Sequence, residues 1–140
     1  MRVSYKQLVD EHDEIADMAD RLLGDMSHTP ADALASRLTD FARLVKAHIQ
    51  HECSALAQVE PTRLNARWDA AWGEGMPRFR KLQADWVMYL CTWDERTIAA
   101  RRDDFVHATG SMLARLRERM AAENEALYSI ALQTSAIAMA

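Results

Sequence analysis

Apolar side chains recur at steps of three and four residues along most of this 140-residue chain. That spacing places them on one face of an α-helix, because about 3.6 residues complete a turn. Glycine (4 residues) and proline (3 residues) are scarce, which disfavours the many tight turns of a β-rich fold. The pattern therefore predicts an all-α fold. The apolar positions form four stripes: Leu8, Ile15, Ala19, Leu22 and Met26; Leu34, Leu38, Phe41 and Val45; Phe79, Leu82, Trp86, Leu90 and Trp93; and Phe105, Met112, Leu116 and Leu127.

The stripes and the breaks between them predict four main helices joined by short links. Thr29, directly before Pro30, is expected to be the N-cap of the second helix. Thr92-x-x-Glu95 is a capping-box pattern that would begin a new segment after the third helix. Four helices with short connections are typical of an antiparallel up-down four-helix bundle. The length fits one domain, so we expect a single bundle over residues 1–140.

The composition argues against several classes of protein. Acidic residues outnumber basic ones by 21 to 17, and a formal charge of −4 repels phosphate backbones, so we expect no nucleic-acid partner. The sequence has no apolar run near the roughly 20 residues that span a bilayer and no signal-peptide pattern, so we expect no membrane partner. Cys53 and Cys91 lack a C-x-x-C spacing and are expected to be buried thiols of a reducing compartment. These features predict a soluble, cytoplasmic protein.

Polar side chains interrupt three of the stripes where the pattern expects apolar ones. His12 lies in the first stripe, His48 and Glu52 lie in the second, and Arg119 and Glu123 lie in the fourth. His48 and Glu52 are one helical turn apart, so both project toward the same point. Burying a carboxylate without a partner is costly, so inward-facing Glu52 and Glu123 require a compensating cation. A bound metal ion and the guanidinium of Arg119 are the two candidates.

Three segments carry these residues in a distinctive order: LVDEHDEI at residues 8–15, HIQHE at 48–52 and RMAAENEALY at 119–128. This order resembles the hemerythrin-like (HHE cation-binding) domain family. Members of that family are four-helix bundles that hold a non-haem di-iron centre, used for oxygen binding, iron handling, or oxygen and nitric oxide sensing. The resemblance implies non-haem iron as the cofactor and a small diatomic molecule as its ligand. It implies four metal ligands in this chain, namely His12, His48, Glu52 and Glu123.

Two departures from the family pattern remove metal ligands. The family's fourth-helix histidine falls on Arg119, whose guanidinium stays protonated and binds no metal. The family's third-helix histidines have no counterpart in residues 77–93. The sequence therefore predicts an incomplete cation site, either with a metal ion or with none. In a site without metal, Arg119 pairs with Glu52, Glu123 or both inside the bundle, or it reaches solvent and pairs with a surface acid or with Glu123 alone.

The remaining candidates carry weaker signals. His51 flanks the second stripe and is expected to be exposed, and Asp104-x-x-His107 has the spacing of a carboxylate–histidine metal pair without an inward glutamate in register. Trp68 and Trp72 form an i, i+4 pair that either covers the bundle or makes a homodimer contact. The sequence has no glycine-rich phosphate loop and no G-x-S-x-G motif, so we expect a binding, sensing or regulatory protein and no enzyme. The alternatives are a working iron protein that binds O2 or NO, and a metal-free interaction module.

Overall fold

The computed structural model describes residues 5–56 and 76–134, and within these ranges it contains helices and no strand. The prediction of an all-α fold is confirmed for this part of the chain. The arrangement of the helices is compatible with an all-α bundle. None of the described helices combines the length and the apolarity needed to cross a membrane. Trp68 and Trp72 lie outside the described residues. The helices are α1 (Tyr5–Gly24), α2 (Ala31–Leu56), α4 (Met76–Thr92), α5 (Glu95–Ala100) and α6 (Arg102–Thr134).

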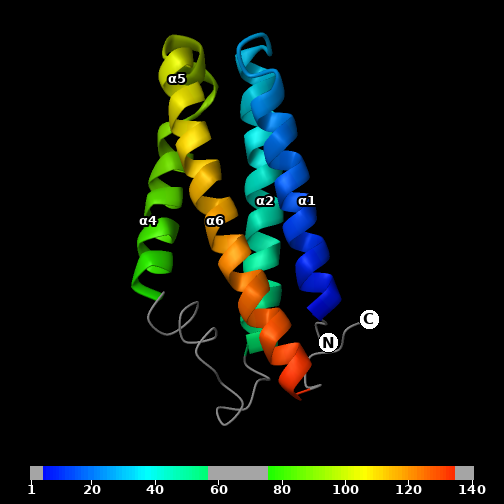
Figure 1. The fold of residues 1–140 in the computed structure, drawn as a ribbon. Helices are drawn as coiled ribbons and strands as arrows, with labels where there is room; N and C mark the ends of the chain where they lie inside the picture. Colours follow the sequence, from blue (N-terminus) through cyan, green and yellow to red (C-terminus); the bar gives the residue numbers. More distant parts are fainter. Residues whose placement is uncertain (1–4, 57–75, 135–140) are drawn as a thin grey trace.

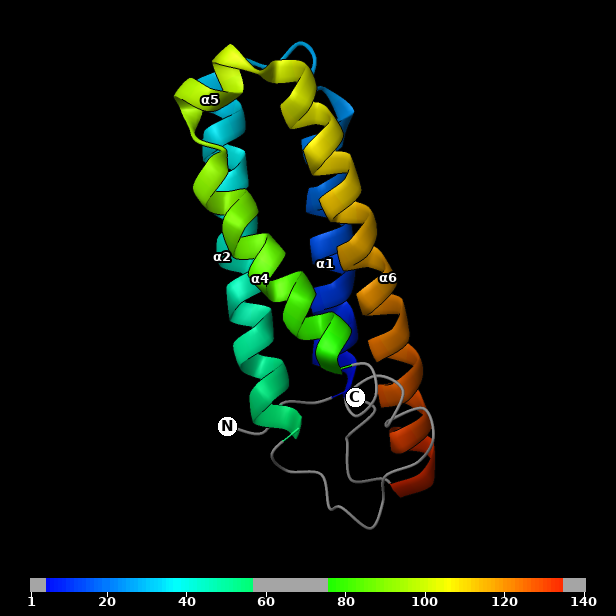
Figure 2. The same cartoon turned by 90° about the vertical axis from the view of Figure 1, so that its left-hand side faces the viewer.

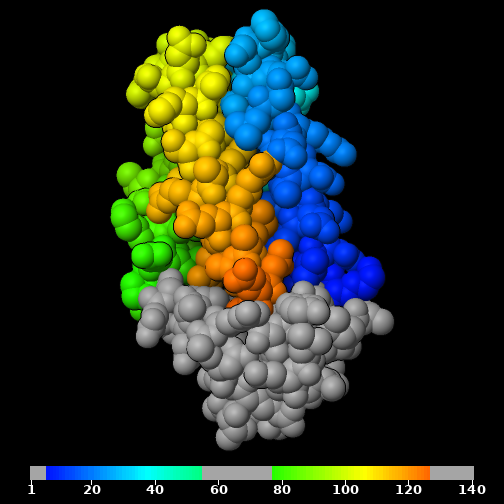
Figure 3. All heavy atoms as spheres, in the orientation of Figure 1, coloured from blue at the N-terminus to red at the C-terminus, as the bar shows by residue number. Residues whose placement is uncertain are grey.

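The four longer helices lie lengthwise beside one another, and the short α5 lies at one end of them (Figure 1). α1 packs against α2 and α6, α4 packs against α6, and α5 packs against both α2 and α6. In the view turned by 90°, α4 runs obliquely to α2 (Figure 2). The space-filling view shows α6 between α4 and α1 on one face of the molecule (Figure 3). Three helices, α1, α2 and α6, therefore share one interior at the end remote from α5.

The half of the interior toward α5 is an aromatic core. Trp86 stacks on Tyr89 with their ring centroids 5.5 Å apart, and Phe105 meets the edge of Trp93 at 5.3 Å. Phe105 is fully buried, and both tryptophans are 7% exposed, as their places in the third stripe predicted. The hydroxyl of Tyr89 forms a 2.6 Å hydrogen bond with Oγ1 of Thr109, so the polar atoms brought into this core satisfy each other. Apolar burial of this kind is the main force that stabilises a helical fold.

Two predicted helix caps are wrong. The N-cap of α5 is Asp94, whose carboxylate accepts a 2.9 Å hydrogen bond from the backbone N–H of Thr97, and not Thr92. An aspartate two residues later thus satisfies the free N–H groups of the first turn. Thr29 is not the N-cap of α2, because the first backbone bond of that helix runs from the N–H of Leu34 to the carbonyl of Pro30. The hydroxyl of Thr29 donates to the backbone carbonyl of Asp25 at 2.7 Å. It satisfies a free carbonyl at the end of the preceding turns instead of an N–H at the start of the next helix.

Both cysteines, which we expected to be buried, are exposed. Cys53 directly follows the buried Glu52 on α2, and each helical residue is rotated by about 100° from the one before it. That rotation carries the Cys53 thiol off the inner face. Composition alone favours buried thiols, but the helical register decides the outcome at each position.

Candidate metal site

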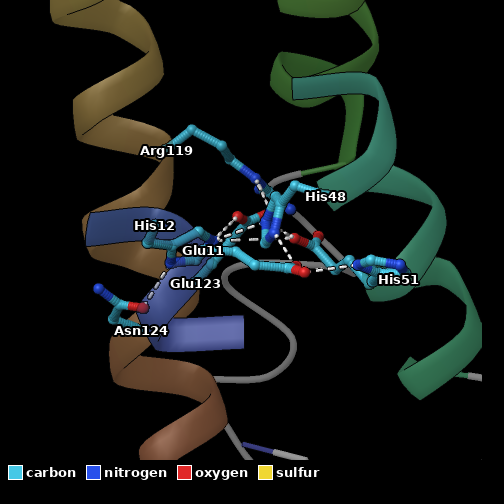
Figure 4. Close-up of polar contacts among 8 residues, drawn as sticks. Glu11, His12, His48, His51, Arg119, Glu123 and Asn124 are labelled. Atoms are coloured by element: carbon cyan, nitrogen blue, oxygen red, sulfur yellow. Dashed lines mark hydrogen bonds and ion pairs between the residues drawn. The ribbon is translucent and has the colours of Figure 1, made fainter. Parts of the chain in front are cut away.

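Four buried polar side chains from three helices meet at one place, and we name them the His/Glu cluster (Figure 4). Its members are His12 on α1, His48 and Glu52 on α2, and Glu123 on α6, each at most 4% exposed. One nitrogen or oxygen atom from each member lies within 4.8 Å of those from the other three. All four occupy core positions of their stripes, so the same periodicity that buries leucines elsewhere buries them.

The donor atoms at the centre of the cluster lie at hydrogen-bonding distances. The Nε2 atoms of His12 and His48 are 2.8 Å apart. Nε2 of His48 is also 2.9 Å from Oε2 of Glu52, one helical turn further along α2. Nε2 of His12 is 3.3 Å from Oε1 of Glu123. Two imidazole nitrogens and two carboxylate oxygens therefore face a common centre.

The outer ring nitrogens of both histidines contact oxygen atoms. Nδ1 of His48 is 2.9 Å from Oε1 of Glu11, and Nδ1 of His12 is 2.5 Å from Oδ1 of Asn124. An ionised carboxylate and an amide oxygen only accept hydrogen bonds, so each Nδ1 carries a proton and donates it. A neutral ring of this tautomer presents an unprotonated Nε2 to the centre of the cluster. Histidines that bind metal ions in proteins are held in the same way, because the outer bond fixes the tautomer and orients the ring.

Glu11 extends the cluster toward the surface. Its second carboxylate oxygen, Oε2, accepts a hydrogen bond from Nδ1 of His51 at 2.5 Å. The side chain of Glu11 is 16% exposed and that of His51 is 40% exposed, so the row from His48 through Glu11 to His51 leads from the interior to solvent (Figure 4). A pocket of about 420 Å³ between α1 and α2 is lined by these three residues and several others. His51, which was expected to be exposed, is only partly exposed and is tied to the cluster through Glu11.

Arg119 points inward and is largely buried. It lies one turn before Glu123 on α6, its side chain is 11% exposed, and its Nε donates a 2.9 Å hydrogen bond to Oε2 of Glu123. Its guanidinium lies over the ring of Phe79, with Cζ 4.2 Å from the ring centroid. Glu123 therefore turns one oxygen toward His12 and the other toward Arg119. Of the two predicted placements of this arginine, the structure has the inward one.

The surroundings shift the pKa values of the two carboxyl groups of the cluster in opposite directions. Burial raises the pKa of Glu52 to about 7, and the nearby charge of Glu123 adds to the effect while the hydrogen bond to His48 opposes it. Burial also opposes the charge of Glu123, but its contacts with His12 and Glu52 and the charge of Arg119 outweigh it and hold its pKa well below the ordinary range. For His48, burial disfavours the charged ring, yet its bonds to Glu52 and Glu11 raise its pKa. Without a metal ion the cluster therefore retains a proton near neutral pH, on Glu52 or on His48.

A small apolar cavity of about 40 Å³ adjoins the cluster. Glu52, Glu123, His48 and Arg119 form one part of its wall. The rest is mainly apolar and comes from α1, α2, α4 and α6, with Ile15, Val45, Ile49, Leu82, Trp86 and Met120 among its lining residues. The cavity is about as large as one water molecule or one diatomic molecule requires.

The structure brings together all four residues predicted as metal ligands. It does so without Asp104 and His107, which are both exposed, and Asp104 is bonded to Arg101 at 3.1 Å. Glu11 and Asn124 were not predicted as parts of the site. Each lies directly next to a predicted ligand, at the flank of a stripe, and this position is the signal that could have identified them. Metal binding itself stays a prediction.

Comparisons of the chain with protein-family models, with curated proteins and with solved structures gave no match.

Proposed function

We propose that this chain is a hemerythrin-like, antiparallel up-down four-helix bundle that binds one divalent transition-metal ion through His12, His48, Glu52 and Glu123. Its role is binding, sensing or regulation, and not the turnover of a substrate. The order of the three motif-bearing segments supports the family. The lengthwise arrangement of α1, α2, α4 and α6 is compatible with the bundle (Figure 1).

The observation that carries this proposal is the 2.8 Å approach of two histidine Nε2 atoms whose Nδ1 atoms are both engaged by oxygen acceptors. Once the proton that the cluster retains near neutral pH leaves, two lone pairs and two carboxylates in one buried place repel one another unless a cation lies among them. Nitrogen and oxygen donors of this type bind a transition metal at about 2.0–2.2 Å, so a modest expansion of the cluster would admit one. The charges also match a divalent ion, because the carboxylates of Glu11, Glu52 and Glu123 are opposed by the single guanidinium of Arg119.

The donor set supports one ion and not two. The four donor atoms lie within 4.8 Å of one another, which is the size of a single coordination shell. A second ion would lie about 3.5–4 Å away and would require ligands of its own. Glu123 is not free to bridge two metals through both of its oxygens, because the second oxygen is bonded to Arg119. The guanidinium thus supplies positive charge where a second metal would otherwise supply it.

A mixture of imidazole and carboxylate donors suits iron, zinc and manganese alike. We propose iron, on the family resemblance. Bound iron would supply a redox-active centre with coordination positions beyond the four that the protein fills. The protein's own contribution is to hold the donors with fixed tautomers in a place at most 4% exposed, which limits the access of water.

A second candidate function is the binding of a small diatomic gas, and the apolar cavity of about 40 Å³ beside the cluster favours it. The cavity wall includes Glu52, Glu123 and His48, so a molecule within it would lie close to an ion held by those residues. Apolar walls favour an apolar ligand over water.

The proposal is tested by titrating the metal-free protein with cobalt(II), whose visible absorption reports the number and type of its ligands. We expect saturation at one ion per chain. The variant His12→Ala should lose the spectrum, because it removes one of two nitrogen donors. The matched control is His107→Ala, which removes an exposed histidine from the same fold and should titrate like the parent.

Three results would contradict the proposal. They are the absence of saturable binding, an equal loss of binding in both variants, and saturation at two ions per chain. The first would favour the metal-free interaction module, in which the His/Glu cluster is a closed network of hydrogen bonds and ion pairs. The third would favour a di-iron protein.

A further inference from the structure

Arg119 also lines a pocket of about 250 Å³ between α4 and α6. The charged side chains around this pocket are mostly basic, although the chain as a whole has a formal charge of −4. One acid, Glu118, is among them. We name the four basic residues the basic pocket, and they are Arg78, Lys81, Arg115 and Arg119.

Two of these cations are held side by side by one carboxylate. Oδ2 of Asp85 is 3.2 Å from Nζ of Lys81 and 2.9 Å from Nη1 of Arg115. Hydrogen bonds from Arg115 and Lys81 lower the pKa of Asp85, so the carboxylate stays ionised. One negative charge shared by two cations leaves them with a net positive charge. Asp85 therefore positions the two head groups without neutralising them.

Arg119 is the least exposed cation of the pocket. Its side chain is 11% exposed, whereas that of Arg115 is 38% exposed and that of Lys81 is 74% exposed. The bond to Glu123 and the ring of Phe79 hold its guanidinium in one orientation. Because Glu123 already pairs with this guanidinium, Arg119 forms a fixed wall of the pocket. The remaining positive charge comes from Arg78, Lys81 and Arg115.

We infer that the basic pocket binds a small oxyanion with at least two negative charges, of the phosphate class. Arg78 and Arg115 carry guanidinium N–H donors that match the oxygens of a phosphate group, and Lys81 adds a point charge. A volume of about 250 Å³ is below the usual range for drug-sized ligands, so the ligand is an inorganic phosphate or a small phosphate ester. This inference goes beyond the proposed metal site and does not require a metal ion.

The experiment is a calorimetric titration of the metal-free full chain with inorganic phosphate, at constant ionic strength maintained with chloride. We expect saturable binding of one phosphate per chain. The double variant Lys81→Gln/Arg115→Gln should bind at least tenfold more weakly, because it removes two of the four cations. The matched control is Arg43→Gln/Lys46→Gln, which removes two exposed cations from α2 and should bind like the parent.

Circular dichroism of both double variants, recorded before the titration, separates loss of the site from loss of the fold. Phosphate should also raise the melting temperature of the parent and of the α2 control, but not of the pocket variant. The inference is overturned if the parent shows no saturable binding, or if the two double variants lose affinity equally. Because the protein is metal-free throughout, neither result bears on the cobalt titration, and failure of one proposal is distinguishable from failure of the other.

Discussion

The two halves of the interior are about equally buried, but they use different sets of helices and differ in what they require. Toward α5, the aromatic core around Phe105 is complete, and its buried hydroxyls of Tyr89 and Thr109 satisfy each other at 2.6 Å. At the other end, His12 and His48 bring two imidazoles into contact with carboxylates, and their charge is offset by Arg119 and by the raised pKa of Glu52, which favours its protonated form. The comparison indicates that the first half stabilises the fold and that the second half uses this stability to hold charged groups.

The largest expected effect lies in the aromatic half. Phe105→Ala should lower the free energy of unfolding by about 4 kcal/mol, because it removes a fully buried ring and leaves a cavity. Urea denaturation of the metal-free and metal-loaded protein measures the loss, and it should be the same in both states. A loss confined to the metal-free protein would contradict the claim that the aromatic half stabilises the fold independently of the His/Glu cluster.

The next effect lies in the polar half. Arg119→Met keeps most of the side chain's volume but leaves Glu123 buried without its cation, so the metal-free protein should lose about 3 kcal/mol. Cobalt should recover part of this loss, because the ion neutralises the same carboxylate. Urea denaturation with and without cobalt measures both quantities. A loss below about 1 kcal/mol would show that the guanidinium does not balance the charge of Glu123.

A smaller effect should appear in the free energy of unfolding, which we expect the polar half to make dependent on pH between 4.5 and 7. The folded-state pKa of Glu52 is raised from 4.5 to about 7, so its contribution to stability is complete below pH 4.5 and is lost as the pH rises through 7. The raised pKa of His48 acts in the same direction. We expect the metal-free protein to lose on the order of 2 kcal/mol across this window.

The matched variant for this pH dependence is Glu52→Gln, which cannot ionise and should flatten the profile. Thermal unfolding at half-unit steps of pH measures both proteins. If the stability of the metal-free parent rises with pH between 4.5 and 7, the folded-state pKa of Glu52 is not raised.

The smallest effect tests whether the aromatic half is complete in itself. Tyr89→Phe removes one hydrogen bond and leaves the buried hydroxyl of Thr109 without that partner, at a cost of about 1 kcal/mol. Adding Thr109→Val should restore much of the loss, because both partners are then apolar. Chemical denaturation of the two variants measures the cycle. No recovery in the double variant would mean that the two hydroxyls do not act as a pair.

The helices and the four members of the His/Glu cluster could be predicted because both follow from periodicity. A residue three or four positions from Leu8 or Val45 lies on the same helical face whatever the rest of the fold does. His12 and His48 are at such positions, and their burial follows directly. The cost of burying a carboxylate then predicts that a cation is required at Glu52 and Glu123.

The remaining features depend on how the helices are rotated and spaced, which periodicity does not define. Glu11 and Asn124 lie at the edges of their stripes, and only the approach of α1 to α2 and of α6 to α1 brings them to the histidine rings. Asp94 replaced Thr92 as a cap because two polar residues compete at one helix end. The position of Arg119 was ambiguous because a long side chain can point either way from the edge of a stripe.

The most direct test of the central claim is anomalous diffraction at the zinc edge from crystals grown with zinc. We predict one strong peak among α1, α2 and α6, about 2.0–2.2 Å from Nε2 of His12, Nε2 of His48 and the carboxylates of Glu52 and Glu123. A peak only at exposed residues such as His107, or no peak at all beside intact His12–His48 contact, would contradict it.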